Sequence, residues 1–170
     1  DNGNGVGFYT RGKLIVTNTV FRDNDIGLRH SGYGGSAGLS VAQSLFESNK
    51  HRGLSFYSQS DLQITDSKFR LNGTMNSEIE PSCPTRSNGS GAGAYIRANG
   101  RKIVATVERS IFEQNQGSFG GGIYLGINIE SARISNSIFR DNTAIGAENC
   151  SIDVTGQAGS AIWDRNATPI

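Results

Sequence analysis

Apolar and small polar residues alternate along this 170-residue chain in a unit that recurs at intervals of about 25 residues. In each unit a β-branched residue is followed three positions later by serine or threonine, and two positions after that by phenylalanine. Alternation with a period of two is typical of strands whose successive side chains point to opposite faces. The unit closes with the motif Phe-x-x-Asn, which occurs at Phe21–Asn24, Phe46–Asn49, Phe69–Asn72, Phe112–Asn115 and Phe139–Asn142.

A strand-and-turn unit that recurs this regularly predicts a solenoid, and we expect an all-β chain folded as a right-handed parallel β-helix of about six coils. One domain would then cover residues 1–170. The step from Phe69 to Phe112 is longer than the others, which predicts an insertion. Two loops are therefore expected to leave the solenoid after the asparagine position, over residues 73–90 and 143–159. A β-sandwich or β-barrel with chance spacing is the alternative.

Alignment on the phenylalanine groups the residues into columns, whose members would stack about 4.8 Å apart on successive coils. The phenylalanine and the hydroxyl residue are expected to point inward, and the residues beside the phenylalanine outward. The outward column after it alternates in charge, which favours in-register stacking because neighbours attract. This column contains Arg22, Glu47, Arg70, Glu113 and Arg140. The outward column before the phenylalanine is mostly apolar and contains Val20, Leu45, Lys68, Ile111 and Ile138.

The asparagine column has a backbone reason, because asparagine tolerates turn conformations and its amide can hydrogen-bond to the amides of the coils on either side. We therefore predict a buried ladder of Asn24, Asn49, Asn72, Asn115 and Asn142.

A second strand follows each asparagine turn and begins with glycine or alanine and an apolar residue. We align Gly7-Phe8-Tyr9, Gly27-Leu28-Arg29, Gly53-Leu54-Ser55, Gly93-Ala94-Tyr95, Gly122-Ile123-Tyr124 and Ala161-Ile162-Trp163. The third position would point outward and carry Tyr9, Tyr95, Tyr124 and Trp163. Aromatic side chains in such a stripe could contact sugar rings or a partner. The alternative is the ordinary preference of aromatic residues for an exposed sheet.

The repeated Phe-x-x-Asn motifs, with Gly120-Gly121-Gly122-Ile123 before a further coil, are similar to those of a known family. They resemble the GGA(I)/FxxN repeats of polymorphic outer-membrane proteins and related pectate-lyase-like β-helices. The resemblance covers nearly the whole chain, from Gly5 to Trp163. It implies a cell-surface passenger or adhesive region and does not imply an enzyme.

Charge and hydropathy narrow the choice of partners. The chain carries 16 basic and 15 acidic residues, for a formal net charge of +1. This near-neutrality disfavours nucleic acid as a partner, and no apolar run is long enough for membrane insertion. Because the chain begins with Asp1, we expect a processed protein or a segment of a longer protein or filament.

The two cysteines are Cys83 and Cys150, one on each predicted loop. We predict a disulfide between them and hence an oxidising, extracellular compartment, the alternative being two free thiols in a cytosolic protein. Asn-x-Ser/Thr sequons occur at four asparagines. Asn72 belongs to the ladder and should be inaccessible, so the expected glycosylation sites in a eukaryotic source are Asn88, Asn149 and Asn166.

Catalytic and metal-binding signals are weak. The chain has no pair of adjacent aspartates, and its two histidines, His30 and His51, are expected to be structural or solvated. No cofactor is expected. A Ca²⁺ ion held between the two loops is the one metal site that the sequence allows, with acidic ligands from Glu78, Glu80, Glu148 and Asp153.

These patterns favour a non-enzymatic structural or adhesive β-helix module in an extracellular or cell-surface protein. Its expected partners are further β-helix coils or copies of itself, in end-to-end or lateral association as a fibril, and glycans. The alternatives are a polysaccharide lyase or hydrolase and a carbohydrate-binding β-helix without catalysis.

Overall fold

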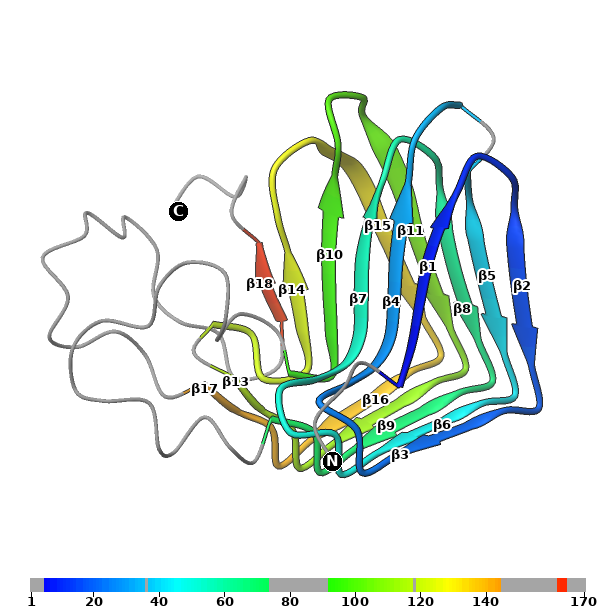
Figure 1. The fold of residues 1–170 in the computed structure, drawn as a ribbon. Helices are drawn as coiled ribbons and strands as arrows, with labels where there is room; N and C mark the ends of the chain where they lie inside the picture. The colour runs from blue at the N-terminus through cyan, green and yellow to red at the C-terminus, as the bar shows by residue number, and fades with distance from the viewer. Residues whose placement is uncertain (1–4, 36, 74–91, 118, 145–161, 165–170) are drawn as a thin grey trace, which may run out of the picture.

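The prediction of a right-handed parallel β-helix is confirmed by the computed structural model, which describes residues 5–35, 37–73, 92–117, 119–144 and 162–164. The coils wind around one axis (Figure 1), and within the described residues five of them contribute a strand to each of three sheets while the sixth contributes a strand to one. All strand pairs are parallel, and neighbours in a sheet come from successive coils. The described residues contain no helix.

The three sheets differ in strand length. Sheet A has six strands: β1 (Val6–Thr10), β4 (Ile26–Gly32), β7 (Arg52–Ser58), β10 (Ala94–Ala98), β14 (Ile123–Leu125) and β18 (Ile162–Asp164). Sheet B has β2 (Leu14–Thr17), β5 (Leu39–Ala42), β8 (Leu62–Thr65), β11 (Ile103–Glu108) and β15 (Ile129–Ser135). Sheet C has β3 (Val20–Arg22), β6 (Leu45–Glu47), β9 (Lys68–Arg70), β12 (Ile111–Glu113) and β16 (Ile138–Arg140).

A short fourth sheet pairs β13 (Gln116–Gly117) with β17 (Thr143–Ala144). Thr143 and Ala144 were assigned to the second loop from the sequence, and that boundary is wrong. The backbone N–H of Thr143 donates to the carbonyl of Asn115 at 2.8 Å, so the inter-coil pairing continues past the asparagine position. The rest of both predicted loops, from residue 74 and from residue 145 onward, lies outside the described residues.

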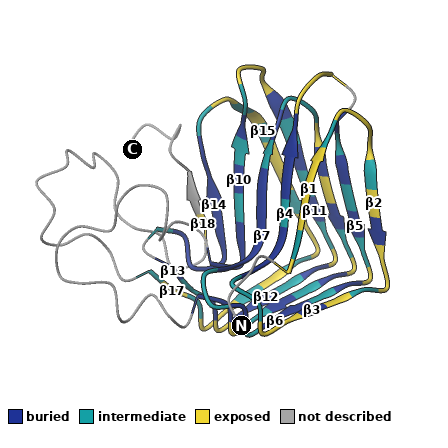
Figure 2. Cartoon of the chain, viewed as in Figure 1, coloured by how far each residue is buried: buried dark blue, intermediate teal, exposed yellow. Residues whose placement is uncertain are grey.

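The core is built from in-register columns of inward side chains. The phenylalanine column stacks face to face, with ring centroids 4.5 Å apart for Phe46 and Phe69 and 4.6 Å for Phe69 and Phe112. All three rings are fully buried. Figure 2 shows buried residues concentrated in the middle coils, whereas β1 is more exposed. Each stacked pair adds about 0.5–1.5 kcal/mol beyond the burial of its area.

The asparagines form a continuous ladder beside the phenylalanine column. The Oδ1 atom of Asn72 accepts from the backbone N–H and from Nδ2 of Asn49, at 3.2 and 2.8 Å. Nδ2 of Asn72 in turn donates to the carbonyl of Phe46 and to Oδ1 of Asn115. The same pattern recurs from Asn24 to Asn142. One side chain thus satisfies backbone groups of the turn that would otherwise be buried without partners.

The hydroxyl column works in the same way at the preceding corner of the coil. Ser44 Oγ donates to the carbonyl of Ala42 at 2.8 Å and accepts from the backbone N–H of Thr19 at 3.2 Å. Ser67 and Ser110 repeat this arrangement. A small hydroxyl residue is needed here because the side chain must bond to a carbonyl of its own coil and to a backbone N–H of the preceding coil.

The alternating charges outside the phenylalanine column form ion pairs between coils. Glu47 contacts both Arg22, at 3.2 Å, and Arg70. Glu113 receives a hydrogen bond from Nε of Arg140 at 2.8 Å and also pairs with Lys68 of the neighbouring column. The hydrogen bonds from these two cations lower the pKa of the Glu113 carboxyl. Flanking cations allow both glutamates to be largely buried on an outer face.

Each coil turns at two corners where the backbone is left-handed without glycine. The φ angles lie between 47° and 58° at Asn18, Gln43, Asp66, Arg109, Asn136, Asp23, Ser48, Leu71, Gln114 and Asp141. A side chain with a Cβ atom is disfavoured in this region by about 1 kcal/mol or more. The recurrence of the corners shows that the inter-coil pairing outweighs this local strain.

The register of the first coil differs from the sequence alignment by two residues. Val6 pairs with Leu28 and Gly7 with Arg29, so Tyr9 lies opposite Ser31. Gly5 therefore occupies the glycine position that was assigned to Gly7. A Cβ atom at Gly5 would lie 2.6 Å from the Asn24 side chain, which explains why this position takes glycine. A shift of two residues preserves the inward and outward faces, and for that reason the alternation alone could not detect it.

Removing one member of the ladder should cost far more than removing an exposed amide. Asn72→Ala leaves the buried Asn49 donors without their acceptor, so we expect a loss of roughly 3 kcal/mol or more in the free energy of unfolding. Chemical denaturation measures this loss. Gln63→Ala, which removes an exposed amide on β8, is the matched control and should change stability by less than about 0.5 kcal/mol. Equal effects of the two variants would contradict the structural role of the ladder.

Relief of the strain at a left-handed corner should stabilise the fold. Leu71 is partly exposed and has a φ of 54°, so Leu71→Gly removes the Cβ penalty at little cost in packing. We expect a gain of about 0.5–1 kcal/mol in unfolding free energy. Gln63→Gly, within a strand, should instead lose stability by about the same amount. A loss in both variants would count against strain at the corner.

Candidate functional site on the outer face of sheet A

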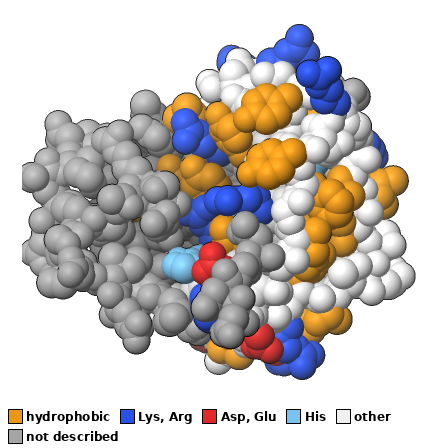
Figure 3. Space-filling model, in the orientation of Figure 1, with side chains coloured by type: hydrophobic (Ala, Val, Ile, Leu, Met, Phe, Trp, Pro, Cys, Tyr) orange, Lys and Arg blue, Asp and Glu red, His pale blue; other side chains and the backbone are white. Residues whose placement is uncertain are grey.

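The outer face of sheet A brings aromatic and cationic side chains together. Residues in register on successive coils form an outward column of Arg29, Ser55, Tyr95 and Tyr124. A second outward column contains Tyr9, Ser31, Tyr57 and Arg97. Hydrophobic side chains and those of lysine and arginine share this face in Figure 3.

A three-membered stack occupies the first column. The Arg52 guanidinium lies over the Tyr95 ring at 4.3 Å from its centroid, and the Tyr95 and Tyr124 rings stack at 4.9 Å. Arg52 and Tyr124 are buried, with 5% and 6% of their surface exposed, while Tyr95 is half-buried. Burial lowers the pKa of Arg52 to about 10, so the side chain remains a cation at neutral pH. Tyr95 is therefore the ring of this stack that a ligand can reach.

A second cation and ring pair lies in the neighbouring column. The Arg97 guanidinium lies 5.5 Å from the centroid of Tyr57, and the Tyr57 hydroxyl donates to Oδ1 of Asn99 at 2.8 Å. Both side chains of the pair are half-buried. The hydrogen bond fixes the ring, and the ring in turn holds the guanidinium against the sheet. Tyr57 and Arg97 were not among the residues predicted from the sequence.

A histidine and an aspartate meet at the edge of the same face. Nδ1 of His51 lies 2.5 Å from Oδ1 of Asp25 on the preceding coil, and both side chains are about one-third exposed. The sequence alignment did not pair His51 with Asp25, because the two residues stand at different positions of the repeat. Asp25 directly follows the ladder asparagine of its coil, whereas His51 comes two positions after Asn49. The additional residue, Lys50, shifts the register of the turn. The backbone bond from His51 N–H to the Asp25 carbonyl establishes the true pairing.

The other histidine belongs to the core. His30 is fully buried, its ring stacks 5.4 Å from that of Phe56, and Nε2 donates to the carbonyl of Ala37 at 2.8 Å. Nδ1 has no hydrogen-bond partner among the described residues. Burial lowers the pKa of His30, which keeps the imidazole neutral. Its role is therefore structural.

Several residues predicted from the sequence lie outside the described part of the chain. These are Cys83 and Cys150, the sequon asparagines Asn88, Asn149 and Asn166, and the acidic residues Glu78, Glu80, Glu148 and Asp153. The backbone of Trp163 pairs with Tyr124, and its side chain is not described. Asn72 is fully buried in the ladder, so its sequon is inaccessible.

Within residues 5–35, 37–73, 92–117, 119–144 and 162–164, no group of three or more His, Cys, Asp or Glu side chains could hold a metal ion. The same ranges contain no helix that is long and apolar enough to cross a membrane.

The parallel coils, the asparagine ladder and the stacked phenylalanines define a β-helical solenoid protein. Residues 1–125 match the family model described as "Right handed beta helix region". The match spans well over half of the chain, and the protein belongs to this family. No curated protein and no solved structure was found to match the chain.

The neutral, buried His30 predicts a loss of stability in mild acid. Its folded-state pKa lies below the ordinary value of about 6.5, so the unfolded chain binds more protons and stability falls as the pH drops below about 6.5. His30→Phe should remove this contribution. Urea midpoints at pH 8 and pH 5 measure this contribution. Both proteins compared carry His51→Gln, so that His30 is the one histidine that can titrate. An unchanged pH dependence in the phenylalanine variant would contradict the assignment.

Proposed function

We propose that this β-helix is a non-enzymatic structural and adhesive module that works outside the cell or at its surface and contacts its partner through the outer face of sheet A. A glycan is the partner whose chemistry fits this face best. Further β-helix coils, from another copy or from the same parent protein, are the second proposed partner, because an open parallel strand edge pairs with a strand of the same kind. The predicted Cys83–Cys150 disulfide and the three sequons support the extracellular location.

The observation that carries the proposal is the pairing of guanidinium groups with tyrosine rings on an outer face. Sugar rings stack their apolar sides on aromatic rings, and arginine donates several hydrogen bonds in a fixed geometry to hydroxyl and carboxylate oxygens. The half-buried Tyr95 and Tyr57 rings offer the stacking surface, and the half-buried Arg97 guanidinium offers the hydrogen-bond donors, on two neighbouring coils. Both pairs join the same two coils, through β7 and β10, so together they form one contact point of fixed geometry.

The distribution of charge strengthens this choice. Net charge alone disfavours anionic partners, but β1, β4, β7, β10 and β14 of sheet A carry Arg29, Arg52 and Arg97 and no acidic residue. The local field at sheet A is therefore more positive than the composition indicates. A glycan with acidic groups is favoured over a neutral one for this reason.

A polysaccharide lyase or hydrolase remains a second candidate, and the Asp25–His51 pair favours it. A carboxylate that holds one imidazole nitrogen orients the other nitrogen for proton transfer, and Arg52 follows His51 directly at the edge of the glycan face. An enzyme would form product from the glycan that it binds, which an adhesive module would not.

A glycan array combined with an assay for new reducing ends or unsaturated ends separates these functions. We expect binding to acidic glycans without product, and Arg97→Ala should weaken that binding about tenfold, because it removes one cation from the face. Arg133→Ala removes an exposed arginine from sheet B and is the matched control. Product formation that His51→Gln abolishes would establish the enzyme instead, and absence of binding to any glycan would refute the adhesive proposal.

A further inference from the structure

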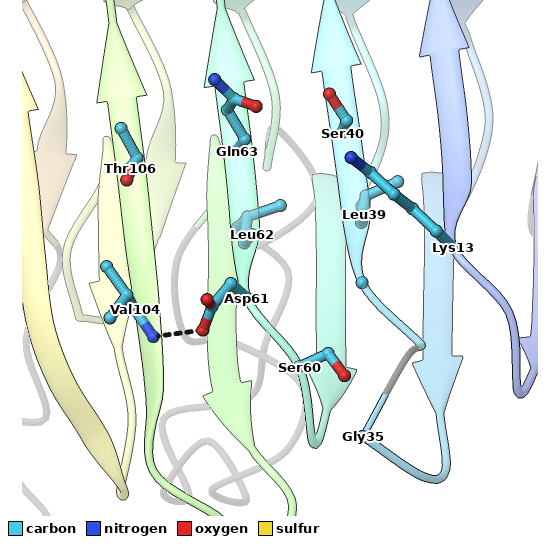
Figure 4. A pocket seen from close by; sticks show the side chains of 11 residues that line it. Lys13, Gly35, Leu39, Ser40, Ser60, Asp61, Leu62, Gln63, Val104 and Thr106 are labelled. Carbon is cyan, nitrogen blue, oxygen red and sulfur yellow. Dashed lines mark hydrogen bonds between the residues drawn. The ribbon is translucent and has the colours of Figure 1, made fainter.

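The outer face of sheet B carries a hollow of about 400 Å³ at the ends of β2, β5, β8 and β11 (Figure 4). Its polar lining comes from Lys13, Ser40, Ser60, Asp61, Gln63 and Thr106. These residues belong to four successive coils and to a different sheet from the face that carries the tyrosine and arginine pairs. The volume lies within the range of about 300–1,000 Å³ that is typical of small-molecule sites.

The hollow exists because one side chain is missing from a column. Leu14, Leu39 and Leu62 are in register, so the residues before them, Lys13, Gly38 and Asp61, occupy equivalent places on three coils. Gly38 leaves a gap between a cation and an anion whose backbones are two coil spacings, or about 10 Å, apart. A Cβ atom at Gly38 would lie 3.1 Å from the carbonyl oxygen of Asp61 and would narrow this gap.

The opposite wall is a column of neutral polar residues. Ser40 pairs with Gln63 in the register of β5 and β8, and Gln63 with Thr106 in that of β8 and β11. Figure 4 shows Lys13 extending across β5 with its ammonium group beside Ser40. The side chains of these four residues make no hydrogen bond or ion pair within the described ranges. Their polar groups are therefore available to a ligand in the hollow.

Asp61 is held in place by a backbone hydrogen bond from β11. The pairing of β11 with β15 shifts register between Ile103 and Val104, and the backbone N–H of Val104 donates to Oδ1 of Asp61 at 2.8 Å. This bond positions the carboxylate at the edge of the hollow and leaves Oδ2 without a hydrogen bond in the described residues. The carboxylate of Asp61 is thus fixed in position before a ligand binds.

The lining selects a ligand by hydrogen bonding and charge. Lysine only donates, aspartate only accepts, and serine, threonine and glutamine do both. No aromatic residue lines the hollow, the side chains of Leu39 and Leu62 are buried in the core, and Val104 is the one remaining apolar side chain of the lining, so an aromatic or lipid-like ligand finds little apolar surface. A sugar, whose hydroxyl groups donate and accept in turn, matches this set. An acidic group on the sugar matches the ammonium of Lys13.

We propose that this hollow binds a single acidic saccharide unit, with its carboxylate at Lys13 and its hydroxyl groups bonded to Asp61, Ser40, Gln63 and Thr106. The site is independent of the proposed glycan face on sheet A. It would anchor a sugar end or branch at a second point of the rod.

Titration of the ¹⁵N-labelled protein with glucuronate, glucose and glucosamine tests the site, because the three probes differ mainly in charge. We expect glucuronate to shift the backbone amide signals of Ser40, Gln63 and Thr106 with a dissociation constant of about 1 mM. Glucose should bind about fivefold more weakly, since it lacks the partner of Lys13. Equal binding of glucosamine and glucuronate, or no shift of these signals by glucuronate, would overturn the proposal.

Matched variants separate this site from a general surface effect and from the glycan face. Lys13→Gln should reduce glucuronate binding to the level of glucose, while Lys102→Gln, outside the hollow, should leave it unchanged. Gly38→Ala should weaken both sugars because it narrows the gap. Arg97→Ala should not move these signals at all. If Arg97→Ala removes the shifts and Lys13→Gln does not, the sugar binds to sheet A and the hollow is not a site.

Discussion

The structure depends on one repeated contact, the hydrogen bond from each coil to the side-chain oxygen of the next. At the asparagine ladder, one Oδ1 atom accepts from both the backbone and the side chain of the preceding coil. Buried turns leave polar backbone groups that no sheet can pair, and each unpaired group would cost about 1–3 kcal/mol. Because the ladder satisfies them, the coil can turn sharply, and the phenylalanines can stack at a spacing near 4.5 Å.

This contact also explains what the outer surfaces can do. Once the inner columns hold the register, the outward positions are free to vary, and each column presents chosen side chains at a constant spacing. Sheet C uses its columns to neutralise charge, with Glu47 and Glu113 between cations. Sheet A uses them to pair guanidinium groups with tyrosine rings, and sheet B leaves a polar gap at Gly38. In this coil geometry the inward residues determine stability, and the outward residues are available for recognition.

The sequence predicted those features that repeat in every coil. The phenylalanine, hydroxyl and asparagine columns could be predicted from the sequence because inward residues tolerate few substitutions and recur at a fixed place in the motif. Contacts that depend on the length of a turn could not be predicted from the motif. The Asp25–His51 pair is one of them, because Lys50 makes one of the two turns longer by a residue. The first coil was misaligned because a shift from Gly5 to Gly7 preserves the alternation. The hollow on sheet B could not be predicted from the sequence, because it forms where Gly38 has no side chain to fill the space.

The ladder has a direction, and this makes the two ends of the rod unequal. The ladder asparagines from Asn24 to Asn115 and the hydroxyl residues from Thr19 to Ser110 each donate their backbone N–H to the side-chain oxygen of the following coil. Loss of the following coil would leave the buried backbone N–H of a ladder asparagine without its acceptor, whereas loss of the preceding coil would free its side-chain amide, which donates to the phenylalanine carbonyl there. A chain made from its N-terminus therefore completes each coil only when the next one is laid down.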